Sequence, residues 1–134
     1  MTVKGKITIR RLKKPDNDNI NESLQWFCKS LGLFGTRDKD KSRFRMFVIL
    51  LRSIPRKNGL TSDEISDRVG LSRGTVVHHL NQLMDAGIVV YRERKYLIKV
   101  DNLSSLIEDI EYDMLKTMSK LKEVAEDIDK RLEL

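Results

Sequence analysis

The chain has 134 residues, of which 40% are hydrophobic and 34% charged, with 26 Lys and Arg against 20 Asp and Glu and a net charge of +6. This length and composition fit one domain of ordinary size and exclude a chain that is mainly disordered. A single cysteine, Cys28, excludes a disulfide framework within the chain. Because the sequence has neither a run of 18 apolar residues nor an apolar N-terminal stretch, we expect a soluble cytoplasmic protein.

The charge is distributed unevenly along the chain. Residues 1–60 contain 15 Lys or Arg and 5 Asp or Glu, residues 61–100 contain 6 and 5, and residues 101–134 contain 5 and 10. The balance therefore falls from +10 through +1 to −5. An acidic C-terminal segment is poorly suited to contact a polyanion, so any nucleic acid is expected at the basic end or the middle of the chain.

The first 35 residues are expected to form a basic arm followed by a helix. Weak alternation of apolar and polar residues over 3–12 indicates a short strand or an extended arm. Apolar residues then recur at spacings of four, three and four from Ile20 to Leu31, which indicates an amphipathic helix with Asn19 as its N-cap.

The middle of the chain predicts two further helices. One should run over about 41–54 and stop at Pro55. After a turn, the sequence Thr61-Ser-Asp-Glu64 forms a capping box, in which the Thr hydroxyl and the Glu carboxylate satisfy backbone amides of the first turn. That box should open a short helix ending at Val69.

A corner, another helix and a hairpin should follow. Ser72 is placed to cap a helix over 73–86. Residues 88–91 and 96–100 are rich in β-branched and aromatic residues, and they flank a charged tip over 92–95. This pattern predicts a β-hairpin.

A long final helix is expected from a cap at Asn102 to about Leu132, with a length of roughly 45 Å. Its apolar stripe repeats at nearly seven residues and cannot be buried within one chain of this size, so we expect a coiled-coil-like dimerisation helix. The dimerisation residues are predicted to be Leu103, Ile107, Ile110, Met114, Met118, Leu121, Val124, Ile128 and Leu132.

Residues 71–89, which read Leu-Ser-Arg-Gly-Thr-Val-Val-His-His-Leu-Asn-Gln-Leu-Met-Asp-Ala-Gly-Ile-Val, resemble the recognition-helix signature of the prokaryotic ArsR-like transcriptional regulators. The resemblance covers about 61–100, and the flanks match only in layout. It implies a mainly α fold with a small β-hairpin, the winged helix-turn-helix. We accordingly divide the chain into a basic N-terminal arm and helix (1–35), a DNA-binding domain (36–100) and the dimerisation helix (101–134).

Helical spacing turns one face of the predicted recognition helix outward, and in this motif the helix N-terminus enters the major groove. DNA contacts are therefore predicted for Ser72, Arg73, Gly74, Thr75, Val77, His78 and Asn81. Arg73 suits guanine, Asn81 suits adenine, and the Val77 methyl groups suit thymine. A solvated helix face without a partner is the alternative for these residues.

The hairpin, or wing, is predicted to contact backbone phosphates or the minor groove through Arg92, Arg94 and Lys95. A charged hairpin tip without a partner is the alternative here. Asp85 would repel phosphate, so it should mark the limit of the contact surface.

Neither a metal nor another cofactor is expected, although many ArsR members sense metals. The helix over 62–69 has no cysteine, and residues 101–134 have no histidine. Adjacent His78 and His79 point about 100° apart on a helix and cannot chelate one ion together. No Gly-rich phosphate loop and no nucleophile with a nearby base is found, so we do not expect an enzyme.

The leading hypothesis is a homodimeric, sequence-specific DNA-binding transcriptional regulator, cytoplasmic and associated with the nucleoid. Its expected partners are double-stranded DNA and a second copy of the chain, without a membrane. An architectural DNA-coating protein and a winged-helix protein-interaction module are the alternatives. The sequence leaves open whether transcription is activated or repressed, which DNA sequence and genes are bound, and whether an effector binds. It also leaves open whether the last helix forms a dimer or a higher oligomer, and what residues 1–35 do.

Overall fold

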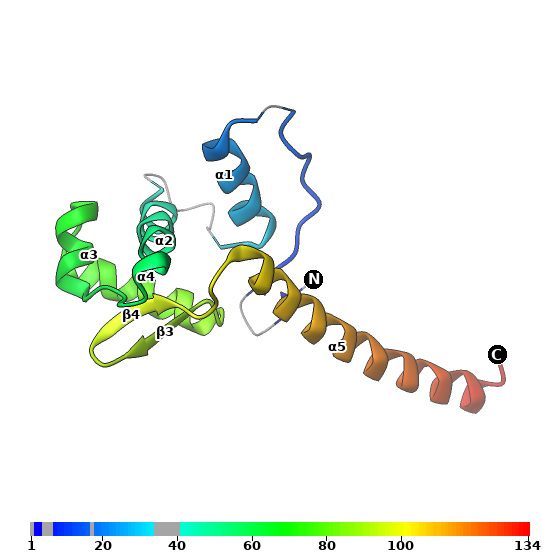
Figure 1. Ribbon diagram of the computed structural model, residues 1–134. Helices are drawn as coiled ribbons and strands as arrows, with labels where there is room; N and C mark the ends of the chain where they lie inside the picture. The colour runs from blue at the N-terminus through cyan, green and yellow to red at the C-terminus, as the bar shows by residue number, and fades with distance from the viewer. Residues whose placement is uncertain (1, 4–6, 17, 34–40) are drawn as a thin grey trace.

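The computed structural model describes residues 2–3, 7–16, 18–33 and 41–134 (Figure 1). The boundary expected between residues 35 and 36 lies outside the described residues. In chain order the elements are β1 (Thr2–Val3), β2 (Ile7–Thr8), α1 (Ile20–Ser30), α2 (Ser42–Ser53), the 3₁₀ turn η1 (Ile54–Arg56), α3 (Ser62–Val69), α4 (Arg73–Asp85), β3 (Val89–Arg92), β4 (Lys95–Ile98) and α5 (Leu103–Leu132). The mainly helical fold with a hairpin and a long last helix confirms the predicted fold class.

Each predicted helix cap is present. The Asn19 side chain accepts the backbone N–H groups that follow it at the start of α1, and Ser72 and Asn102 do the same for α4 and α5. At α3 the Thr61 hydroxyl accepts the Glu64 N–H at 3.1 Å, and the Glu64 carboxylate accepts the Thr61 N–H at 3.1 Å. Local sequence therefore sets where these helices begin, since such a cap is worth about 1 kcal/mol.

The wing differs from its prediction in the length of its tip. β3 and β4 pair antiparallel from Val89↔Ile98 to Arg92↔Lys95, so only Glu93 and Arg94 form the turn. Both turn residues have positive φ, of 50° and 67°, as a tight two-residue hairpin turn requires. Two of the residues assigned to the tip therefore lie in the paired strands.

A third chain segment extends the wing sheet by a single bridge. The Leu60 N–H donates to the Tyr96 carbonyl at 2.9 Å, and the Tyr96 N–H donates to the Leu60 carbonyl at 2.7 Å. Because Thr61, the N-cap of α3, directly follows Leu60, this bridge connects the start of α3 to β4.

The N-terminal arm is docked along α1. After β1 and β2, which pair antiparallel, the Thr8 N–H donates to the Leu31 carbonyl at 3.3 Å and the Arg10 N–H to the Ser30 carbonyl at 2.8 Å. The Trp26 indole N–H donates to the Leu12 carbonyl at 3.0 Å. Figure 1 shows the arm on the side of α1 away from α3 and the wing.

One hydrophobic core joins these parts. Its buried residues come from β2, α1, the helix-turn-helix, the wing and the first turns of α5. In α5, Leu106 and Ile110 are each 3% exposed, so the expectation that this stripe stays uncovered within one chain is wrong for its first turns. From residue 115 onward every residue is exposed, and Figure 1 shows this part of α5 projecting from the rest of the molecule.

Candidate nucleic-acid interface

Helix α4 buries one face and exposes the other, as its sequence spacing predicts. Val76, Leu80 and Leu83 are at most 1% exposed and anchor the helix in the core. Six of the seven predicted contact residues are exposed, and the remaining one, Val77, is half-buried. The exposed set is Ser72, Arg73, Gly74, Thr75, His78 and Asn81.

Two polar interactions organise the start of α4. The Ser72 hydroxyl accepts the Thr75 N–H at 3.2 Å and donates to the Thr75 hydroxyl at 2.9 Å, so both hydroxyls belong to the cap. The Arg73 guanidinium lies 3.7 Å from the Asp63 carboxylate of α3, and both side chains are more than 70% exposed. An ion pair this exposed contributes at most about 1 kcal/mol, so Arg73 can leave it for another acceptor. Sequence spacing gave no indication of the Asp63 contact.

Nothing in the described structure requires a glycine at position 74. A Cβ placed there would meet no atom within 4 Å, and no positive φ is found at this position. Glycine within a helix costs roughly 1 kcal/mol relative to alanine. The absent side chain therefore leaves open space beside Arg73, at the N-terminal end of α4.

The wing lies next to this end of α4. The Tyr91 and Tyr96 rings meet edge to face with centroids 4.7 Å apart, and Tyr91 is exposed. Burial raises the pKa of Tyr96, the neighbouring Tyr91 adds to the rise, and the positive charge of Arg73 opposes it. Arg73 is thus close enough to act on a residue of β4. Arg92 and Arg94 are exposed and Lys95 is half-buried.

The second half of α4 borders a hollow of about 430 Å³. Its walls include His78, Asn81 and Asp85 from α4 and Arg43 from α2. The Arg43 guanidinium donates to the Leu33 carbonyl at 2.9 Å and also to the Gln82 side chain. His78 and Asn81 are therefore set beside a recess, whereas Arg73 and Thr75 stand at the open helix end. Arg43 was not among the predicted site residues, because only the fold brings it to α4.

The histidines and the cysteine are not grouped for metal binding. The His78 and His79 rings are tilted with centroids 5.8 Å apart, and among the residues that the structure describes no three His, Cys, Asp or Glu could hold one ion. Cys28 is fully buried, and burial raises the pKa of its thiol to about 12. At neutral pH Cys28 is therefore a protonated core residue.

Comparison with known protein families gives a match to the helical middle of the chain. A sequence model of the family described as "Bacterial regulatory protein, arsR family" matches residues 47–91, which run from α2 through α3 and α4 into β3. No curated protein and no solved structure matches the chain. Within the described residues, no helix is both long and apolar enough to cross a membrane.

Proposed function

We propose that the chain binds a specific DNA site as a homodimer. The premise is that residues 47–91 are a helix-turn-helix domain of the ArsR family, whose members are DNA-binding transcription regulators and not enzymes. The observation that carries the proposal is the exposed N-terminal end of α4, where Arg73, Gly74 and Thr75 form an open surface backed by a fully buried stripe. In this motif that end enters the major groove.

In the proposed complex, base contacts and phosphate contacts come from different elements. Arg73 leaves Asp63 and bonds guanine through two parallel hydrogen bonds, which an exposed ion pair is too weak to prevent. Asn81 and His78 reach bases farther along the groove. The exposed wing residues Arg92 and Arg94 contact the backbone or the minor groove and orient the domain without reading the sequence.

The proposed dimer forms through the second half of α5. Met118, Leu121, Ala125, Ile128 and Leu132 follow one another at spacings of three and four, the pattern of a coiled-coil seam. Leu121 and Leu132 are 59% and 64% exposed, although large apolar side chains that share one helix face are usually buried. Because Leu103, Ile110 and Met114 already pack against the chain's own core, the proposed interface is narrower than the sequence suggested and centres on residues 115–132.

A hollow on the same face supports a second helix as the occupant. It measures about 420 Å³ and is lined by the large residues Leu115, Met118, Leu121 and Lys122 and the small residues Ser119 and Ala125. Such a site can receive a side chain of a facing helix, as a hole receives a knob in a coiled coil. A projecting helix with one apolar face is only marginally stable alone in water, so a partner helix also stabilises it.

Selection of binding sites from random duplexes at physiological salt tests this function. A specific regulator enriches a palindromic sequence whose half-sites lie about one helical turn apart and binds it at least about a thousandfold more tightly than unrelated duplex. Similar affinity for all duplexes would instead support the architectural alternative. Undetectable duplex binding even at low salt would contradict both and favour a protein-interaction module.

A further inference from the structure

Three arginines that are not among the predicted DNA contacts lie around a hollow of about 410 Å³. The hollow lies where the end of α2, the 3₁₀ turn, α3 and the start of β4 meet. Its lining includes three arginines, Arg52, Arg56 and Arg68, together with Lys95 and one acidic residue, Glu64. Four cations face one carboxylate, so the hollow is strongly electropositive.

The one carboxylate in this hollow is already engaged. Glu64 accepts the Thr61 N–H in the capping box, and its pKa is lowered mainly by its hydrogen bonds to Thr61 and further by the charges of Lys95 and Arg68. Within the described part of the chain, none of the three arginines forms an ion pair with a carboxylate. Their guanidinium groups are therefore available to an external anion.

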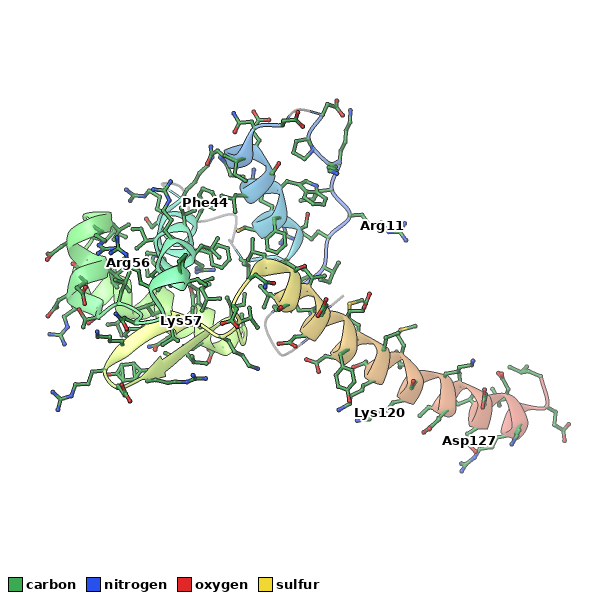
Figure 2. The ribbon with its side chains drawn as sticks, in the orientation of Figure 1. Arg11, Phe44, Arg56, Lys57, Lys120 and Asp127 are labelled. Atoms are coloured by element: carbon green, nitrogen blue, oxygen red, sulfur yellow. The ribbon has the colours of Figure 1, made fainter. Side chains whose placement is uncertain are left out.

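The basic surface continues beyond this hollow on both sides. A shallower hollow of about 210 Å³ on the α2–α3 side shares Arg52 and Arg68 and adds Arg45. On the wing side a hollow of about 220 Å³ has Lys57 and Arg92 in its lining, together with one acidic residue, Asp101. We call the surface formed by Arg45, Arg52, Arg56, Lys57, Arg68, Arg92 and Lys95 the basic band; Arg92 and Lys95 are shared with the predicted wing contacts. Figure 2 shows Arg56 and Lys57 on the side of the molecule that carries α3 and the wing, away from the projecting part of α5.

The basic band adjoins the recognition surface. Asp63 of α3 contacts Arg73 at the start of α4, and the next residue, Glu64, faces the cations of the hollow. Lys95 lines the hollow, while Tyr96 beside it lies within the electrostatic influence of Arg73. A polyanion lying on the open end of α4 can therefore also reach the cations of the band across α3.

We propose that the basic band is a phosphate-binding site that holds the sugar–phosphate backbone of the same duplex, outside the stretch contacted by α4 and the wing tip. This inference rests on the proposed DNA-binding function and extends it. Arginine suits the role because its planar guanidinium can bond phosphate through two parallel hydrogen bonds. The contacts carry no base information, so the band sets affinity and footprint length rather than sequence preference.

Neutralising the three arginines of the hollow tests the proposal. The full-length triple variant carries Arg52→Gln, Arg56→Gln and Arg68→Gln. Each bond to phosphate adds about 0.9 to the slope of log affinity against log salt concentration. We therefore expect DNA affinity at 0.15 M salt to fall about fivefold for each such bond that the substitutions remove. The loss of affinity should be equal for the selected site and for unrelated duplex. Hydroxyl-radical protection should shrink at the flanks of the site and remain unchanged at its centre.

A control variant on the N-terminal arm removes the same number of charges. Arg10→Gln, Arg11→Gln, Lys13→Gln changes three exposed residues, and Figure 2 shows Arg11 on the opposite side of the molecule from Arg56. This variant should keep the flanking protection and most of the affinity. Thermal melting of both variants checks that the fold is retained, as expected for changes at exposed positions.

Three outcomes would overturn the inference. If the triple variant binds the selected duplex as tightly as the control and keeps its footprint, the band does not hold DNA, and an acidic protein segment becomes the better partner. If inorganic tripolyphosphate binds the unmodified chain but not the triple variant while DNA affinity is equal in both, the hollow takes a free anion. If the unmodified chain itself binds no duplex, the proposed function fails together with this inference.

Discussion

The two halves of α5 share one apolar stripe and have opposite surroundings. In the first half Leu106 and Ile110 are each 3% exposed and belong to the core, whereas in the second half Leu121 and Ile128 are 59% and 45% exposed. The difference arises from geometry, since a core of this size covers only the first turns of a helix about 45 Å long. A continuous stripe can thus serve the fold at one end and association at the other.

Charge divides the same helix at the same place. Residues 101–113 contain five Asp or Glu and no Lys or Arg, whereas residues 114–134 contain five of each sign. The whole acidic excess therefore lies in the half that packs against the core, and the projecting half is neutral. A neutral apolar face allows two copies to lie side by side without electrostatic repulsion.

The largest expected effect comes from making the projecting half polar. In the double variant Leu121→Gln, Ile128→Gln, a dimer loses four apolar side chains, each worth about 1.5–3 kcal/mol when buried, so association should weaken by more than a thousandfold. Sedimentation equilibrium measures this change. Glu123→Gln, Lys130→Gln is the matched control, because both positions lie opposite the seam and the net charge is unchanged; equal weakening in the control would contradict the assigned face.

Truncating a side chain in the first half should affect folding instead. In the monomeric background of the preceding variant, Ile110→Ala should lower the free energy of unfolding by about 2–4 kcal/mol through the cavity that it leaves. Ile107→Ala, at a position that is 39% exposed, should cost less than about 1 kcal/mol. Urea unfolding compares the two, and similar losses would show that the halves of α5 do not differ as described.

Two arginines of the DNA-binding domain should separate base reading from backbone binding without affecting the dimer. Arg73→Ala should remove about 1–3 kcal/mol of discrimination between the selected site and its variants, because in the proposed complex the guanidinium contacts a base edge. Arg94→Ala should weaken binding to all duplexes alike. Competition binding against selected and random duplexes measures both, and parallel losses for the two variants would oppose this division.

The smallest expected effect is a gain in folding stability together with a loss of DNA affinity. Gly74→Ala should raise the free energy of unfolding by about 0.5–1 kcal/mol, because alanine is the better helix former and its Cβ meets no atom within 4 Å. It should also reduce affinity for the selected duplex, since the methyl group would occupy the open space into which we propose that DNA fits. A stabilised variant with undiminished affinity would show that the open space at Gly74 serves no contact.

Sequence patterns predict those features that depend on neighbouring residues. The Thr61–Glu64 capping box, the Ser72 cap and the buried stripe of α4 follow from spacings within one helix. The predicted tip of the wing is too long, because Glu93-Arg94 lacks the Asn-Gly chemistry that normally marks a two-residue turn.

Contacts between segments that are distant in the chain cannot be predicted from sequence patterns. The contact of Arg43 with Gln82, the ion pair of Arg73 with Asp63 and the basic band all depend on how the helices pack. The division of α5 into a core-packed half and an exposed half also cannot be predicted, because its apolar spacing continues unchanged past the edge of the core. Local rules set the elements, whereas tertiary packing decides which of their exposed faces adjoin.

The stoichiometry of the DNA complex tests the central claim most directly. Sedimentation equilibrium of the full chain with a duplex that carries the selected palindrome should give two chains per duplex, and the Leu121→Gln, Ile128→Gln variant should give this complex only at far higher protein concentration. A native complex with one chain per duplex at full affinity, or a double variant that assembles as readily as the unmodified chain, would contradict the account.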